Sequence, residues 1–347
     1  MPDETKSYLV QILSELCNEF EAVITLEPDF KRAGYIDFPS GKRVFFKGTS
    51  FDINGQGAGL IAKDKEYAAR FLAMAGLRVP EGVLCFSPRY IEKMRRKNAA
   101  VANKLSAFET AIRYSEASEF PLIVKPNEGS EGDGVRLVSN AEGLCLHIGR
   151  LFEEHERVLV QRPCKGEDFR LVVLDGAVIS AYRRLPLRIE GDGRSTVAQK
   201  MDEVANALRK SGRNPTLVLD RGAVSEFLAS RGRSLSDVPE NGEVWTLLPN
   251  ANLSTGGLAE DVTENVCDEF AHIAAQSAKA LGLRYAGVDL LCDSLDRFDP
   301  EYVVLEVNSA PGLNNFGRSG ERQNEKVVGL YRELMAAVEL GDSHGKE

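Results

Sequence analysis

Acidic side chains interrupt two apolar runs in the last quarter of the sequence. Asp289 lies inside the run 286–291, and Glu306 and Asn308 stand two residues apart at the end of a second run. Residues two apart in a strand point to the same face, so Glu306 and Asn308 can share a ligand. Two carboxylates and an amide oxygen, completed by water and phosphate oxygens, suit Mg²⁺, with Mn²⁺ as an alternative.

The same acids allow a second interpretation. An acid in an apolar strand is costly unless it is paired or bound to metal. Asp289 and Glu306 could therefore pair with arginines such as Arg170 or Arg183. We favour the metal site, because three oxygen donors converge near the ends of strands.

A lysine followed by a glycine-rich loop is the next candidate. Residues 121–135 form an apolar run that ends at Lys125, a loop with four glycines or serines, and a second apolar run, which predicts a strand, a loop and a strand. Glycines let the backbone come close to a ligand, and a lysine with exposed N–H groups suits phosphate oxygens. The loop has neither the Walker A order nor a G-x-G-x-x-G at a helix start. A plain hairpin, whose glycines serve only the turn, is an equal alternative.

Arginines gather on a predicted hairpin, residues 168–174 and 177–184, joined by the strong turn signal Asp-Gly. Alternation places Asp168 and Arg170 on one face, but Arg183 and Arg184 on opposite faces, so only one of the latter two can face a site. Arginine can hold phosphate or carboxylate oxygens with two hydrogen bonds, although some of these side chains could be solvated edge charges.

A polar loop closed by glycines, residues 250–257, adds N–H and hydroxyl donors that suit an anion. No Ser–His–Asp or Cys–His arrangement stands out, so the sequence does not support covalent nucleophilic catalysis.

Helical and strand patterns mix around these motifs. The predicted helices are 7–20, 64–74, 89–118, 141–154, 196–210, 268–281 and 324–339. The predicted strands, besides those flanking the motifs above, are 34–38, 43–46, 157–161, 243–248, 287–292 and 302–307. Because several strands are joined by hairpins, we predict an α+β fold with largely antiparallel sheets.

The composition excludes some partners. The 347 residues carry 43 Lys+Arg against 52 Asp+Glu, a net charge of −9, which lacks the footprint of a nucleic-acid binder. No apolar run reaches membrane-spanning length and the first residues show no signal pattern. Six scattered cysteines without C-x-x-C spacing indicate reduced thiols rather than disulfides or zinc ligands. We expect a cytoplasmic protein that binds neither nucleic acid nor membrane, and a homo-oligomer is left open.

Seven motifs in this order resemble the ATP-grasp ligases, most closely the ATP-grasp region of cyanophycin synthetase and of bifunctional glutathione synthetase. The motifs lie at residues 63–65 with 75–80, 124–126, 166–170, 191–197, 252–257, 287–289 and 306–312. Each is weak alone, but the series is strong evidence for the superfamily. The motif at 191–197 and the insertion that follows it favour the cyanophycin and glutathione branch.

The resemblance implies an ATP-grasp fold, in which two α+β subdomains hold ATP with Mg²⁺ or Mn²⁺ between them. It assigns Lys65 and Lys125 to the phosphates. The lid loop over the phosphates would include Glu128, Gly129, Ser130, Gly132, Gly134 and Val135. The adenine edge and the ribose would meet Gln161, Arg162, Pro163, Glu167 and Asp168. The metal would be held by Asp289, Glu306 and Asn308, and the phosphate or acyl phosphate by Arg170, Asn252 and either Arg183 or Arg184.

The activity implied is an ADP-forming ligation of a carboxylate, through an acyl phosphate, to an amine of an amino acid or peptide. The substrates would be small-molecule acids and amines. The alternatives are an ATP-dependent kinase on the same scaffold and a nucleotide-binding module without turnover. The expected organisation is a shortened N-terminal region (1–60), a helical lead-in (61–120), a lid subdomain (121–165), a C-terminal subdomain (166–340) with an insertion at about 195–245, and a tail (341–347).

Overall fold

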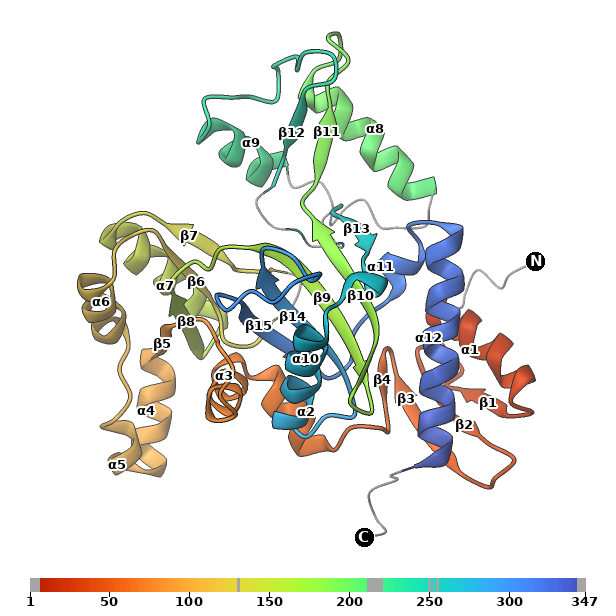
Figure 1. Cartoon of the computed structure of the whole chain (residues 1–347). Helices are drawn as coiled ribbons and strands as arrows, with labels where there is room; N and C mark the ends of the chain where they lie inside the picture. Colours follow the sequence, from red (N-terminus) through yellow and green to blue (C-terminus); the bar gives the residue numbers. More distant parts are fainter. Residues whose placement is uncertain are drawn as a thin grey trace.

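The computed structural model describes residues 7–129, 132–210, 221–248, 251, 253 and 256–341. The predicted site residues Ser130 and Asn252, and tail residues 342–347, lie outside this part of the chain. Within the described part, helices combine with antiparallel sheets (Figure 1). The predicted α+β fold is therefore confirmed.

The largest sheet lies at the centre of the molecule. Its order is β13-β10-β9-β14-β15, and every neighbouring pair is antiparallel. The strands are β9 (Glu167–Leu174), β10 (Ala177–Leu185), β13 (Leu258–Asp261), β14 (Tyr285–Cys292) and β15 (Val303–Asn308). Asp175 and Gly176 have φ angles of 48° and 83°, and two successive positive φ angles are what a type I′ hairpin turn needs. The hairpin predicted from this dipeptide is therefore confirmed.

One face of the central sheet is covered by helices. These are α2 (Gln56–Lys63), α3 (Lys65–Met74) and α10 (Asp268–Ala280). Their apolar side chains share a core with Phe169, Leu171 and Val173 of β9 and with Val288 and Leu290 of β14. Asp64 caps α3 by accepting a hydrogen bond from the backbone N–H of Tyr67. This is the N-cap that the sequence predicts.

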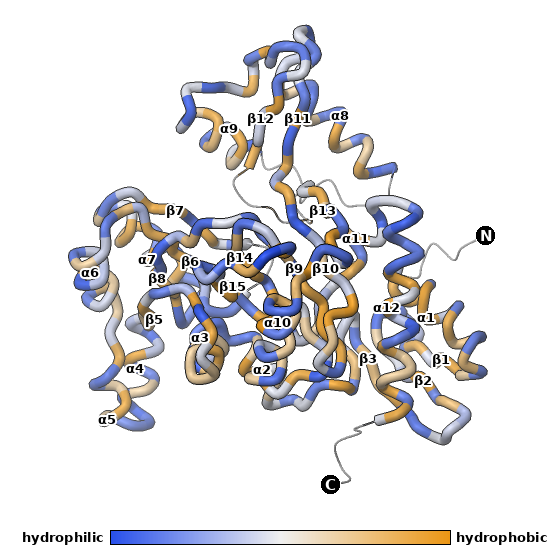
Figure 2. Tube along the Cα trace, viewed as in Figure 1, coloured by the Kyte–Doolittle hydropathy of each residue, from blue (hydrophilic) through white to orange (hydrophobic). Residues whose placement is uncertain are grey.

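The opposite face is covered over only part of its length, by an N-terminal unit and the long C-terminal helix. The N-terminal unit comprises α1 (Tyr8–Glu19) and a sheet of β1 (Val23–Leu26), β2 (Ala33–Asp37), β3 (Arg43–Lys47) and β4 (Ser50–Phe51). The C-terminal elements are α11 (Asn314–Gly317) and α12 (Glu321–Leu340), whereas the short helix η3 (Thr263–Asn265) follows β13. Apolar residues of α1, β2, β3 and α12 form one core with Val172, Leu174 and Tyr182 of the central sheet. Along α1 and α12, hydrophobic and hydrophilic stretches alternate, as expected for helices with one buried face (Figure 2).

A second sheet, with the order β5-β8-β6-β7, forms the lid subdomain. Its elements are β5 (Gly82–Phe86), α4 (Pro88–Lys97), α5 (Ala99–Ala102), α6 (Phe108–Ala117), β6 (Leu122–Pro126), β7 (Arg136–Val138), α7 (Ala141–Glu154) and β8 (Arg157–Gln161). The segment 89–118 is largely helical, as predicted, but it forms three helices, because Asn98 ends α4 in an extended conformation and caps α5. Since β5 pairs with β8, the lid sheet begins at Gly82, outside the range 121–165 predicted for this subdomain.

An insertion projects from the body at the top of Figure 1. It comprises β11 (Arg188–Glu190), α8 (Val197–Lys210), α9 (Arg221–Ala229) and β12 (Val244–Thr246). These elements pack around a separate apolar core that includes Met201, Val224 and Trp245. Because β11 pairs with β12, the insertion starts a few residues before the predicted 195.

In the described residues, no helix combines the length and the apolar composition needed to span a bilayer.

Candidate active site

A row of charged side chains lies on the face of the central sheet whose apolar end packs against α12 and the N-terminal unit. The pairing register places Arg184 opposite Asp168, Asp289 opposite Arg170, and Glu306 opposite Asp289. Directly opposed residues in antiparallel strands point to the same face. The four strands β10, β9, β14 and β15 thereby bring together residues that lie as much as 138 positions apart in the sequence, such as Asp168 and Glu306.

Asp289 is the buried centre of this row, with 3% of its side chain exposed. It accepts a bidentate pair of hydrogen bonds from Arg170, of which the Nη2 to Oδ2 bond measures 2.6 Å. Arg184 Nη2 lies 3.0 Å from the same Oδ2. The predicted alternative, that an arginine such as Arg170 pairs with Asp289, is therefore confirmed, although this pairing leaves lone pairs on the carboxylate for a cation.

The two carboxylates of the row have opposite pKa shifts. Burial raises the pKa of Asp168 to about 6, partly offset by Arg184, whose Nη2 donates to Asp168 at 2.7 Å. Burial acts in the same direction on Asp289, but the charges of Arg170 and Arg184 outweigh it and lower the pKa of that carboxyl. Asp289 is thus held ionised in a buried position.

Glu306 and Asn308 meet at the end of β15, as their spacing predicts. Asn308 Nδ2 donates to Glu306 Oε1 at 3.1 Å, and Lys65 Nζ lies 3.6 Å from Glu306 Oε2. Glu306 keeps 30% of its side chain exposed, so its remaining lone pairs are accessible.

The donor set fits a hard cation. In the described part of the chain, no three His, Cys, Asp or Glu side chains gather in a metal-ligating cluster. A cation on this face would therefore depend on the amide oxygen of Asn308 as its third protein donor, with Asp289 and Glu306 as the carboxylates. Oxygen donors of this kind suit Mg²⁺, which keeps several water or phosphate ligands in addition.

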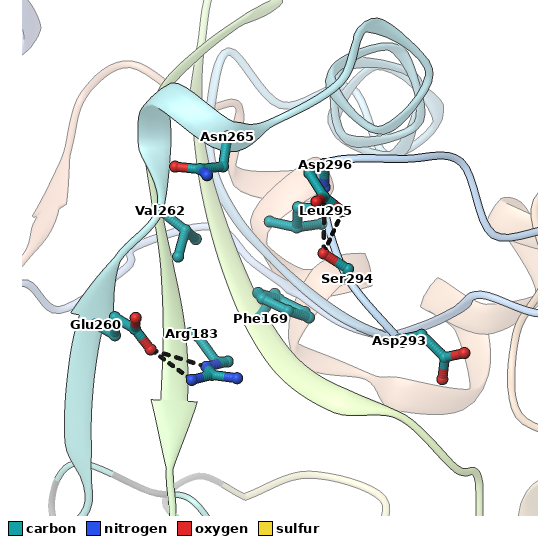
Figure 3. A pocket seen from close by; sticks show the side chains of 9 residues that line it. All are labelled: Phe169, Arg183, Glu260, Val262, Asn265, Asp293, Ser294, Leu295 and Asp296. Carbon is teal, nitrogen blue, oxygen red and sulfur yellow. Dashed lines mark hydrogen bonds and ion pairs between the residues drawn. The ribbon is translucent and has the colours of Figure 1, made fainter.

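Arg183 points to the other face of the sheet. Its Nη2 lies 2.6 Å from Glu260 Oε2 and its Nη1 lies 3.8 Å from Glu167 Oε2. It lines a cavity of about 180 Å³ with Phe169 and the loop 293–296 (Figure 3). Only one of the two arginines was expected to face the site, and Arg184 is the one that contacts Asp289, whereas the strand position of Arg183 turns it away from Asp289.

Two lysines stand beside the charged row, Lys125 of the lid sheet and Lys65 of α3. Lys125, half-buried at the end of β6, has its pKa lowered to about 8 by burial, with Glu306 acting in the opposite direction and Lys65 adding to the shift. Lys65, at the first position of α3, donates from Nζ to the carbonyl oxygen of Gly129 at 2.8 Å. The two predicted phosphate contacts therefore lie near each other and near Glu306.

The base of the lid loop is fastened by an arginine that sequence reasoning missed. Arg157, at the start of β8, donates to the carboxylates of both Asp64 and Glu128. Asn127, fully buried, accepts a hydrogen bond from the backbone N–H of Glu66 at 3.0 Å through Oδ1. The only sequence signal for Arg157 is a charged residue at the start of an otherwise apolar strand. Glu128 thus anchors the loop. We therefore expect this residue to have a structural role in addition to any contact with phosphate.

Three glycines of the lid loop have backbone angles that favour glycine. Gly129, Gly132 and Gly134 have φ angles of 151°, 78° and 67°, in the region that L side chains rarely adopt. A Cβ on Gly134 would also lie 2.9 Å from the ring of Pro126. Gly132 and Val135, two other predicted loop contacts, belong to the turn between β6 and β7, where the N–H of Val135 donates to the carbonyl of Gly132.

The segment 161–166 joins the lid sheet to the central sheet and carries the predicted adenine edge. Gln161 is buried at the end of β8, while Arg162 is exposed and donates to Glu81 at 3.0 Å. Pro163 follows outside any helix or strand. The structure thus places the three residues together in the connection between the subdomains, with Arg162 turned to the surface.

Comparison with known proteins agrees with this architecture. The sequence pattern of the RimK-like ATP-grasp domain matches residues 62–208 and 246–328. Cyanophycin synthetase from Nostoc sp. is 32% identical over 282 residues, which cover 79% of this chain and 29% of that protein. The glutathione biosynthesis bifunctional protein GshAB of Desulfotalea psychrophila is 26% identical over 298 residues, 79% of this chain and 37% of that protein. The chain therefore spans well under half the length of these two relatives.

A solved structure gives the same fold. The crystal structure of a bifunctional glutathione synthetase from Pasteurella multocida aligns with 93% of this chain and 43% of that chain, with a TM-score of 0.59 and 21% identity. The alignment extends beyond the matched family region, because it covers more of the chain than residues 62–208 and 246–328 do.

Proposed function

Because the chain belongs to the family of RimK-like ATP-grasp domains, we propose that it is an ADP-forming ligase that joins a carboxylate to an amine. The observation that carries the proposal is the meeting of Lys65 with Glu306 at 3.6 Å. Lys65, which also donates to the carbonyl oxygen of Gly129 in the lid loop, thereby places a cation between that loop and the row of acids and arginines on the central sheet. Such a site can bind a polyphosphate and neutralise charge that develops during phosphoryl transfer.

Lys125 would hold the phosphates of ATP from the lid side, and Lys65 would hold them from the start of α3. The loop that begins at Glu128 would close over them with its backbone N–H groups. Gln161 to Pro163 would line the adenine, and Asp168 would face the ribose. Arg162 would contribute through its backbone, since its side chain is directed to Glu81. Glu167 would be a weaker candidate for the ribose, because it lies on the face of Arg183.

Asp289, Glu306 and Asn308 would hold Mg²⁺. When bound, the cation would neutralise phosphate oxygens and orient them for in-line transfer. The ion pairs of Asp289 with Arg170 and Arg184 would keep this carboxylate ionised and fixed in orientation.

The reaction would proceed in two steps. A carboxylate oxygen of the acid would attack the γ-phosphorus of ATP, the bond to the β–γ bridging oxygen would break, and ADP would leave. The amine would then attack the acyl carbon, lose a proton, and release inorganic phosphate as the amide forms. Arg184 and Arg170 would stabilise the negative charge on the transferred phosphoryl group. Asn252, which lies outside the described residues, is proposed for the same task.

The substrates would be a small acid and the amine of an amino acid or peptide. The names of the relatives support this class: cyanophycin synthetase and a glutathione biosynthesis protein. Since the chain covers only a part of each relative, we do not transfer either product to it.

A substrate screen tests the proposal. The protein is incubated with Mg²⁺, ATP and pools of acids and amines, and ADP release and product masses are measured. We expect at least one pool to release ADP and give a product lighter by one water than the sum of its acid and amine. Hydroxylamine trapping separates this activity from a kinase, because only an acyl phosphate yields a hydroxamate. Absence of ADP release in every pool, with nucleotide still bound, would contradict the ligase.

Matched variants locate the activity. Lys125→Met and Glu306→Gln should abolish turnover while circular dichroism shows an unchanged fold. Lys97→Met, on the exposed helix α4, is the control and should retain turnover. Wild-type rates in Lys125→Met and Glu306→Gln, as in Lys97→Met, would show that the site is elsewhere.

A further inference from the structure

The loop that follows β15 is held by side chains of the N-terminal part of the chain. Thr49, in the turn between β3 and β4, donates from Oγ1 to the carbonyl oxygen of Ala310 at 2.9 Å. Asn54 donates from Nδ2 to the carbonyl oxygen of Ser309 at 2.8 Å. Both donors lie before residue 62, where the match to the ATP-grasp family begins.

Asn54 also fixes the neighbouring strand. Its Nδ2 donates to the carbonyl of Tyr285 at 2.7 Å, and its Oδ1 accepts from the N–H groups of Arg284 and Tyr285 at 2.9 and 3.1 Å. One side chain therefore joins the start of β14 to the residue directly after Asn308. Because Gly287 of β14 pairs with Asn308 of β15, Asn54 bridges the two strands at the end where they carry the oxygen donors.

The loop is also constrained from the side of the sheet. A Cβ on Gly287 would lie 2.8 Å from Pro311 Cβ and 3.3 Å from Arg170 Cδ. The backbone after Asn308 therefore lies against β14 on one side and is hydrogen-bonded to Thr49 and Asn54. A loop held on both sides has little freedom to move the side chain that precedes it.

We propose that Asn54 and Thr49 are positioning residues that set the orientation of Asn308 toward Asp289 and Glu306. The N-terminal unit would then contribute to the geometry of the cation site. The inference rests on the proposed function, in which these three residues hold the divalent cation. It extends that function to a segment outside the family match. Loss of either hydrogen bond should weaken cation binding without removing the nucleotide contacts of Lys65 and Lys125.

Thr49 offers a matched set of variants, because its side chain is only partly buried. Thr49→Val keeps the shape and removes the donor, whereas Thr49→Ser keeps the donor. Thr25→Val changes an exposed threonine of the same unit and serves as the control. Asn54→Ala is the stronger change, and the Thr49 set decides the question should that variant fail to fold.

Binding of Mn²⁺ is measured by the electron paramagnetic resonance signal of the free ion, in the presence of a non-hydrolysable ATP analogue. Nucleotide binding without cation and the thermal midpoint are measured in parallel. We expect Thr49→Val to weaken Mn²⁺ binding about tenfold, as changes around metal ligands typically do. Thr49→Ser and Thr25→Val should bind as the wild type, and nucleotide affinity without cation should be unchanged in all.

The outcomes separate the inference from the proposed function. Wild-type Mn²⁺ affinity in Thr49→Val would overturn the positioning role and leave the cation site intact. Equal losses of Mn²⁺ binding, nucleotide binding and thermal stability would also overturn it, since they indicate a purely structural contact. Failure of the wild type to bind Mn²⁺, or undiminished binding by Glu306→Gln, would overturn the cation site itself and the inference with it.

Discussion

Lys125 should make ATP binding depend on pH in a range where ATP itself no longer titrates. Burial lowers the pKa of Lys125 to about 8 in the free protein, from the ordinary 10.5. The charged groups that act on it are Glu306 on β15, Lys65 on α3 and Cys164 in the connection between the sheets. A phosphate placed beside the ammonium would favour the protonated form and raise its pKa again.

The sign and size follow from proton linkage. Above pH 8 the free protein loses the proton of Lys125, so binding of ATP must take up a proton and becomes weaker as the pH rises. The dissociation constant should be nearly constant below pH 7.5 and then rise about tenfold per pH unit. Between pH 7 and pH 10 the loss should approach about 100-fold, or ~2.7 kcal/mol at 1.36 kcal/mol per pKa unit.

Titration calorimetry with ATP and no divalent cation, from pH 7 to pH 10, measures this dependence. Lys125→Arg should bind ATP without the break near pH 8, because a guanidinium stays protonated throughout. Lys125→Met should bind weakly at every pH. Cys164→Ala should keep the break, which separates the lysine from the neighbouring thiol. A pH-independent affinity in the wild type, or the same break in Lys125→Arg, would refute the assignment of Lys125 to the phosphates.

Three further changes probe the charged row. Asp289→Ala should lower the free energy of unfolding by about 3–5 kcal/mol in chemical denaturation, because Arg170 and Arg184 would remain buried without their counter-charge. Arg184→Ala should slow turnover at least tenfold, whereas Arg183→Ala, which lies on the other face, should leave turnover within about twofold; equal effects would contradict the assigned faces. Gly287→Ala should cost about 1–3 kcal/mol of stability by overpacking and reduce turnover, and wild-type rates in this variant would show that the loop can shift without consequence.

Most of the secondary structure could be predicted from signals that are local in the sequence. The Asp-Gly turn, the cap at Asp64 and the helix at 141–154 were all predicted, because each depends on residues close together in sequence. The short strands β5 and β13 were not, since four or five residues without alternation give no periodic signal. Their place in a sheet is set by the strand they pair with.

Contacts between side chains on neighbouring strands could not be predicted from the spacing of residues in the sequence. From the sequence we favour a metal as the partner of Asp289, with an arginine as the alternative. The pairing of β9 with β14 places Arg170 directly opposite Asp289, and this strand order has no local signature. The link of Arg157 to Asp64 and Glu128 was missed for the same reason, because it joins two segments of the lid to the start of α3.

One sequence property does locate the site once the strands are aligned. On one face of the sheet, β9 carries the charged Arg170 and, two residues later, the apolar Val172. On the same face, β10 and β14 also change from a charged residue, Arg184 and Asp289 respectively, to uncharged residues. The apolar ends are covered by the N-terminal unit and α12, so the charged ends mark where this cover stops. A charge beneath the cover would have to be desolvated without access to a ligand. The boundary of the N-terminal unit and the position of the site are therefore set by the same change in polarity, which is why side chains at that boundary, such as Asn54, contact the loop that follows Asn308.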